Sequence, residues 1–179
     1  LQENKTSLLI WPHVFRAELM VTIEGDTLQL DFSVVNHGDT AFSFTTALHT
    51  YFRVRNIRQT AVYGLKGCHY RDTVGVAKDC QQTDAVLEIV GETDRIYADV
   101  SSDIVIAQAH QDLQIRQSGF RDAVVWNPGA EKAAQMADVE VDGNQRMLCV
   151  EAATILQAIK LAPGAAWSGT QSMTVHRKI

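Results

Sequence analysis

The sequence predicts an all-β fold, a large sandwich of antiparallel strands. Apolar residues recur mostly with a period of two, polar Gly-containing breaks separate the runs, and about a dozen such runs follow one another. Of the 179 residues, 46% are hydrophobic and 21% are charged, which is the composition of an ordinary folded domain. No repeat, linker or low-complexity segment interrupts the pattern, so we expect residues 1–179 to form a single domain.

The first strands are predicted to form a hairpin. Residues 14–23 alternate imperfectly, residues 24–27 supply a turn around Gly25, and residues 28–35 alternate as a half-buried strand does. A third strand over 41–48 leads directly into His49. Further short strands are expected at 60–65, 84–90, 94–100, 103–109, 112–117, 122–126, 146–151, 155–161 and 170–176.

One short helix is predicted, over 130–137. This segment consists of strong helix formers and follows a natural entry turn, Asn127-Pro128-Gly129. Near the start of the chain, residues 8–12 already have the pattern of a strand. Helix is therefore expected to contribute little to the fold.

Charge and cysteine content exclude several classes of protein. The net charge of −5 argues against a nucleic-acid partner, which needs clustered Lys and Arg. No stretch approaches the ~20 apolar residues of a membrane helix, so no membrane association is expected. Three distant cysteines without CxxC spacing are typical of reduced thiols in a cytoplasmic protein. The six histidines are not spaced as metal ligands, and we expect neither a metal nor another cofactor.

Two polar residues in apolar surroundings are the candidates for chemistry. His49 follows a strand and lies between Leu48 and Tyr51, where partial desolvation could tune its pKa towards neutrality. Glu151 follows four apolar residues and precedes two alanines, so it is either paired or placed for proton transfer. Together they could form an acid–base pair, although each taken alone is more often structural.

Weaker candidates each have a structural alternative. Asp94 could hold a sugar hydroxyl or belong to a loop ion pair with Arg95. Trp126 and Trp167 could stack on a sugar ring or lie at the rim of the core. A short basic run could contact a phosphate or be a solvated strand face; it consists of Arg53, Arg55 and Arg58.

Several short sequence motifs occur here in a fixed order, and together they resemble the hexose-6-phosphate 1-epimerases, a branch of the galactose mutarotase-like family. The resemblance spans nearly the whole chain from about Trp11 onward. It implies a galactose mutarotase-like β-sandwich, also called a supersandwich, with the sugar site on the concave face of one sheet. The motifs are Thr46-Ala47-Leu48-His49-Thr50-Tyr51-Phe52, Thr93-Asp94-Arg95-Ile96-Tyr97, Val124-Val125-Trp126-Asn127-Pro128, Cys149-Val150-Glu151-Ala152, Pro163-Gly164 and Trp167-Ser168-Gly169-Thr170-Gln171.

The resemblance also implies an activity and roles for three residues. The family interconverts the α and β anomers of a hexose 6-phosphate by ring opening, with a His as general acid and a Glu as general base. These motifs match at His49 and Glu151, and the family's sugar-binding Asp matches at Asp94. The expected protein is therefore an isomerase that acts on a small sugar phosphate without a metal or redox cofactor.

The chain is shorter than these enzymes and looks like their C-terminal two-thirds, truncated at the N-terminus. Two alternatives to an active epimerase follow. The chain could be a non-catalytic carbohydrate-binding β-sandwich, which needs no acid–base pair. It could also be an inactive truncated remnant that self-associates through an exposed sheet edge.

Overall fold

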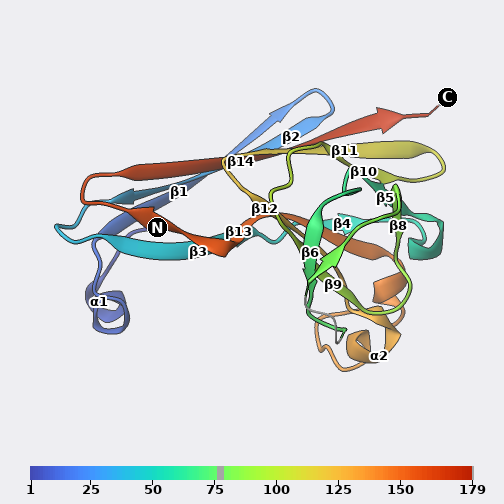
Figure 1. Cartoon of the computed structure of the whole chain (residues 1–179), viewed down its shortest axis with the longest axis horizontal. Coiled ribbons are helices and arrows are strands. Elements are labelled where there is room, and N and C mark those ends of the chain that lie inside the picture. The colour runs from blue at the N-terminus through green and yellow to red at the C-terminus, as the bar shows by residue number, and fades with distance from the viewer. Residues whose placement is uncertain (76–78, 179) are drawn as a thin grey trace.

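Two antiparallel sheets of seven strands dominate the computed structural model, which describes residues 1–75 and 79–178 (Figure 1). The first sheet has the order β1 (Phe15–Glu24), β2 (Thr27–Asn36), β14 (Ala166–Arg177), β11 (Gln111–Ser118), β10 (Ile104–Ala107), β5 (Ala61–Tyr63) and β8 (Val86–Glu88). The second has the order β3 (Phe42–Leu48), β13 (Met147–Leu161), β12 (Asp122–Asn127), β9 (Thr93–Tyr97), β6 (His69–Asp72) and β7 (Cys80–Gln81), and β4 (Tyr51–Arg53) also pairs with β13. The predicted all-β sandwich is confirmed.

Alternating apolar side chains from both sheets form the main core. Val62 and Ile106 from the first sheet, and Val125, Leu148 and Val150 from the second, have no exposed surface. A smaller aromatic cluster surrounds Phe42 and Leu161 and includes Trp11 and Trp167. Trp167 is therefore a partly buried member of this cluster, which agrees with the structural alternative considered for it, a place at the rim of the core.

Helical structure is sparse but differs from the prediction in two places. Residues 8–12 do not begin a strand, because α1 (Lys5–Ile10) covers most of them. The side chain of Asn4 caps this helix by accepting hydrogen bonds from the backbone N–H groups of Thr6 and Ser7. The predicted helix 130–137 is α2 (Gly129–Ala133), and residues 134–136 continue it only as tight turns. The described residues also contain two 3₁₀ turns, η1 (Ile57–Gln59) and η2 (Gly143–Gln145).

The two strands expected at 146–151 and 155–161 are one long strand, β13. Its pairing with β3 shifts register between Thr154 and Ile159, where the strand bends. The buried carboxylate of Asp122 holds this irregular segment by accepting hydrogen bonds from the N–H groups of Ile155 and Leu156. Strands β4, β6 and β7 were not predicted; they have three, four and two residues, too few for a visible period.

The outer edge of the first sheet is only partly covered. Near its start, β1 meets the first residues of the chain, since Ala17 donates its N–H to the carbonyl of Leu1. Further along, Leu19, Val21 and Ile23 are 54%, 55% and 77% exposed, and no described strand pairs with this edge. Among the described residues, none of the helices has the length and apolar character needed to cross a membrane.

Candidate active site

The middle of β13 carries a buried carboxylate. Residues 148–154 of this strand are all buried, so both of its faces are covered. Val150 points into the main core, and Glu151 therefore points to the opposite face of the sheet, as does Cys149 two residues earlier. Glu151 is only 4% exposed. A charged group in this position needs a partner, because an unpaired buried charge is costly.

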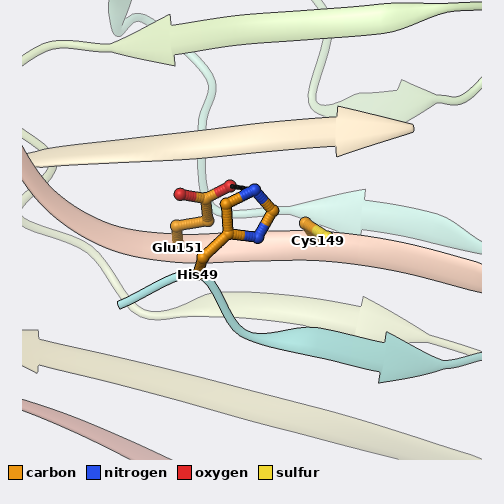
Figure 2. A group of neighbouring side chains, drawn as sticks. All are labelled: His49, Cys149 and Glu151. Carbon is orange, nitrogen blue, oxygen red and sulfur yellow. Dashed lines mark ion pairs between the residues drawn. The ribbon is translucent and has the colours of Figure 1, made fainter. Parts of the chain in front are cut away.

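His49 is that partner. Strand β3 pairs Leu48 with Ala152, and β4 pairs Tyr51 with Cys149, so the two-residue break between these strands puts His49 level with Glu151. The imidazole Nε2 lies 3.2 Å from Glu151 Oε1 (Figure 2). Half of the His49 side chain is exposed, whereas that of Glu151 is 5% exposed. The buried carboxyl group of Glu151 is thus connected to solvent through the half-exposed imidazole of His49.

A buried amide connects the His49 segment to the rest of the molecule. Thr50 donates its hydroxyl to Gln171 Oε1 at 2.7 Å, and Gln171 donates its Nε2 to the carbonyl of Val150 at 3.0 Å. Gln171 belongs to β14 of the other sheet and has no exposed surface. One side chain therefore ties together the neighbours of His49 and of Glu151.

Two aromatic rings hold the imidazole of His49. The ring of Tyr51 stacks on it with a centroid distance of 4.7 Å and an interplanar angle of 17°. The ring of Trp126 meets it edge to face at 5.7 Å. Trp126 therefore lies at the candidate site, unlike Trp167. These contacts restrict the orientation of the imidazole and so direct Nε2 towards Glu151.

Asp94 shares this face of the sheet. Directly opposed residues on antiparallel strands point to the same side, and the register aligns Asp94 with Trp126, and Trp126 with Cys149. Asp94 is half-buried, and its charge is felt at Glu151. The three residues predicted from the sequence, His49, Asp94 and Glu151, are thus all brought to one surface.

Burial sets the acid–base character of this surface. Desolvation first, and the negative charge of Asp94 second, raise the pKa of Glu151 to about 7 from its ordinary value of 4.5. Burial also raises the pKa of the Cys149 thiol and that of the Tyr51 hydroxyl. A carboxyl group with a pKa near neutrality can both accept and return a proton at physiological pH.

Three side chains here could also hold a metal ion. One donor atom each from His49, Cys149 and Glu151 lie within 4.8 Å of one another. The sequence did not suggest this group, because the three residues have no ligand spacing along the chain. The alternation in β13 was the available clue, since it puts Cys149 on the same face as Glu151.

Arg53 and Arg58 of the basic run line different hollows, and one large hollow is lined by neither His49 nor Glu151. This hollow, of about 730 Å³, is lined by residues of β6 and its surroundings, including Arg71 and Asp72. A smaller one of about 330 Å³ is lined by Tyr51 and Arg53 among others, and Tyr51 is the residue that stacks on His49. Arg53 is thus near the site, whereas Arg58 lines a separate hollow with Asn127.

Comparisons with known proteins agree with this architecture. The family model described as aldose 1-epimerase matches residues 1–174, and the chain belongs to that family. A protein of Cenchrus ciliaris, provisionally named glucose-6-phosphate 1-epimerase, is 33% identical over 174 residues, which are 94% of this chain and 53% of that protein. An Escherichia coli protein of the same provisional name is 29% identical over 180 residues, and the match covers 99% of this chain and 59% of that protein.

Solved structures show the same fold. The crystal structure of a provisionally named mutarotase from Salmonella typhimurium has a TM-score of 0.90 at 27% identity. The match covers 99% of this chain and 59% of that protein. A galactose mutarotase-like protein from Clostridium acetobutylicum has a TM-score of 0.76 at 13% identity. The match covers 99% of this chain and 61% of that protein. This chain therefore spans between half and two-thirds of the length of each of these four proteins.

Proposed function

We propose that this protein interconverts the α and β anomers of a hexose 6-phosphate, with Glu151 as general base and His49 as general acid. The observation that supports this most is the 3.2 Å separation of His49 Nε2 and Glu151 Oε1 at a surface open to solvent. The hydroxyl oxygen O1 and the ring oxygen O5 of a pyranose are both bonded to C1. Two groups a hydrogen bond apart can therefore each reach one of these oxygens.

The proposed reaction is a proton exchange around C1. Glu151 takes the proton of the O1 hydroxyl while the imidazolium of His49 gives a proton to O5. The C1–O5 bond breaks, its electron pair goes to O5, and an open-chain aldehyde forms. After rotation about C1–C2, the same groups act in reverse: His49 takes the O5 proton, O5 attacks the other face of C1, and Glu151 returns a proton to O1. Each positioned proton transfer contributes roughly 10²–10⁴-fold.

Asp94 and Trp126 are proposed to orient the sugar. Both lie on the same face as Glu151, in the row across the sheet that includes Cys149. A half-buried carboxylate such as Asp94 can accept hydrogen bonds from sugar hydroxyls, and the indole of Trp126 offers an apolar wall for the ring.

Two exposed arginines on this face are candidates for the phosphate end of the substrate. The register aligns Arg71 with Ile96, Val124 and Glu151, which places it three strands, or about 14 Å, from Glu151. Arg53 lies two residues beyond Tyr51, opposite Met147. With its long side chain, either arginine could reach a phosphate on C6 while C1 remains at the acid–base pair.

The test is anomer exchange measured by NMR on glucose 6-phosphate and on glucose. We expect the chain to accelerate exchange of glucose 6-phosphate above the spontaneous rate, and Glu151→Gln to remove the acceleration. Loss of an arginine–phosphate contact, in Arg71→Ala or Arg53→Ala, should raise KM about tenfold for glucose 6-phosphate and leave glucose unchanged. A folded wild-type chain that gives no acceleration with either sugar would favour the carbohydrate-binding alternative.

Self-association through the first sheet is a separate proposal. The outer part of β1 presents Leu19, Val21 and Ile23, and its backbone edge has no described strand beside it. Such an edge is a template for strand pairing. We propose a second copy of this chain as the partner, with light scattering after size-exclusion chromatography as the test.

A further inference from the structure

We propose that a thiophilic divalent cation, such as Zn²⁺, binds between His49, Cys149 and Glu151 and blocks the candidate active site. The binding itself is independent of the proposed activity, whereas the inhibition rests on it. Figure 2 shows the three side chains gathered at one place on β13 and the segment that precedes β4.

The donor atoms are close to a metal-binding arrangement. One atom from each residue lies within 4.8 Å of the others, and His49 Nε2 and Glu151 Oε1 are already 3.2 Å apart. Around tetrahedral Zn²⁺, with metal–donor distances of about 2.0–2.3 Å, donor atoms lie roughly 3.3–3.8 Å apart. The widest permitted separation exceeds this range by about 1 Å, so binding needs a small shift of the donor side chains, of which only that of His49 is half exposed.

The charges of the group also suit a divalent cation. A neutral imidazole, a thiolate and a carboxylate together carry two negative charges, which one divalent cation cancels. Cys149 and Glu151 are both buried, where a neutral assembly avoids the cost of uncompensated charge. Both groups release their protons as the metal binds, and Tyr51 and Asp94 are the titratable groups nearest to them on the same face.

The donor types select a soft or borderline metal. A thiolate and an imidazole favour Zn²⁺, Cd²⁺ or Co²⁺, whereas Mg²⁺ and Ca²⁺ prefer oxygen ligands only. Three protein donors leave a fourth position, which opens on the exposed side of His49. The metal would occupy the atoms that the proposed reaction uses for proton transfer, so it should act as an inhibitor.

The experiment titrates Co²⁺ into the full chain and follows the ultraviolet band of a cobalt–thiolate bond. We expect a saturable band in wild type, displaced by Zn²⁺, and none in Cys149→Ala. Cys68→Ala is the matched control: it removes another free thiol, and should leave the band unchanged. His49→Ala, an exposed position, should weaken Co²⁺ binding at least tenfold. Absence of the band in wild type, or its survival in a folded Cys149→Ala, would overturn the proposal.

Inhibition is measured separately, as anomer exchange with and without Zn²⁺. Wild type should lose activity over the range of Zn²⁺ that displaces Co²⁺, and Cys149→Ala should keep its activity at more than tenfold higher Zn²⁺. A cobalt–thiolate band in a chain that has no exchange activity would support the metal site and reject the proposed function. Equal Zn²⁺ sensitivity of wild type and Cys149→Ala would reject inhibition through this site.

Discussion

The middle of β13 and the outer part of β1 have similar strand patterns and opposite surroundings. Residues 148–154 of β13 are covered on both faces, whereas Leu19, Val21 and Ile23 of β1 are exposed. In the first region the unexpected residue is polar, the carboxylate of Glu151. In the second the unexpected residues are apolar. Alternation along a segment thus predicts a strand. Which of its residues bear on function depends on whether neighbouring elements bury them.

The largest expected effect comes from removing either member of the acid–base pair. Glu151→Gln and His49→Ala should each lower the catalysed rate of anomer exchange by roughly 10²–10⁴-fold, since each loses one positioned proton transfer. Because the two groups act as a unit, the double variant should be hardly slower than the singles.

The matched control for this prediction is Leu19→Ala on β1, which should keep full activity because the residue is exposed and far along the other sheet. Losses that simply multiply in the double variant would indicate two independent contributions and not one pair.

The second prediction concerns stability and pH. The raised pKa of Glu151 means that the folded protein binds more protons than the unfolded chain between about pH 4.5 and 7, so the free energy of unfolding falls as pH rises through this window. This shift corresponds to about 3 kcal/mol. Denaturant unfolding of Glu151→Gln should therefore show a gain of up to about 3 kcal/mol at about pH 8 that disappears near pH 4.

The control on the exposed strand is Glu18→Gln, which should change the free energy of unfolding by about 0.5 kcal/mol or less, because the Glu18 side chain is 55% exposed. A Glu151→Gln variant that is destabilised equally at both pH values would contradict this prediction. It would mean that the carboxylate stabilises the fold as a member of an ion pair and that burial does not disfavour its ionised form.

The third prediction tests the buried amide that connects the two sheets. Gln171→Met should lower the free energy of unfolding by about 1–3 kcal/mol, because the carbonyl of Val150 loses this side-chain donor and the hydroxyl of Thr50 keeps only the carbonyl of Leu48 as an acceptor. Thr50→Val should cost less alone and add little to Gln171→Met in a double-mutant cycle. Full additivity would show that the two side chains do not act through their shared hydrogen bond.

The smallest effect on stability is expected on β1. Leu19→Lys with Val21→Lys should change the free energy of unfolding by about 0.5 kcal/mol or less, since both side chains are exposed. The same substitutions should convert a dimer to a monomer in light scattering if β1 pairs with a second copy. A wild-type chain that is monomeric at high concentration would contradict self-association.

Much of the fold could be predicted because its long strands alternate. Strand β2 and the first part of β13 were found this way, and the helix α1 was missed because its cap depends on one side chain, Asn4. The short strands β4, β6 and β7 form only where a neighbouring strand offers hydrogen bonds, which a local pattern does not reveal.

His49 and Glu151 could be found as polar residues in apolar segments, and their separation of 3.2 Å supports the pairing that was predicted for them. Their roles remain proposals. Tyr51, Cys149 and Gln171 were missed because their contacts with the pair depend on strand register and on the other sheet. Arg71 was missed for the same reason, as it lies three strands away from Glu151.

We infer that burial in β13 gives Glu151 a proton that can be exchanged near neutral pH. The most direct measurement is a pH titration of the Glu151 carboxyl carbon by NMR, assigned with Glu151→Gln. The structure predicts a midpoint of about 7. A midpoint at the ordinary value of 4.5 or below would contradict it, because the carboxylate would then be too weak a base for the proposed proton transfer.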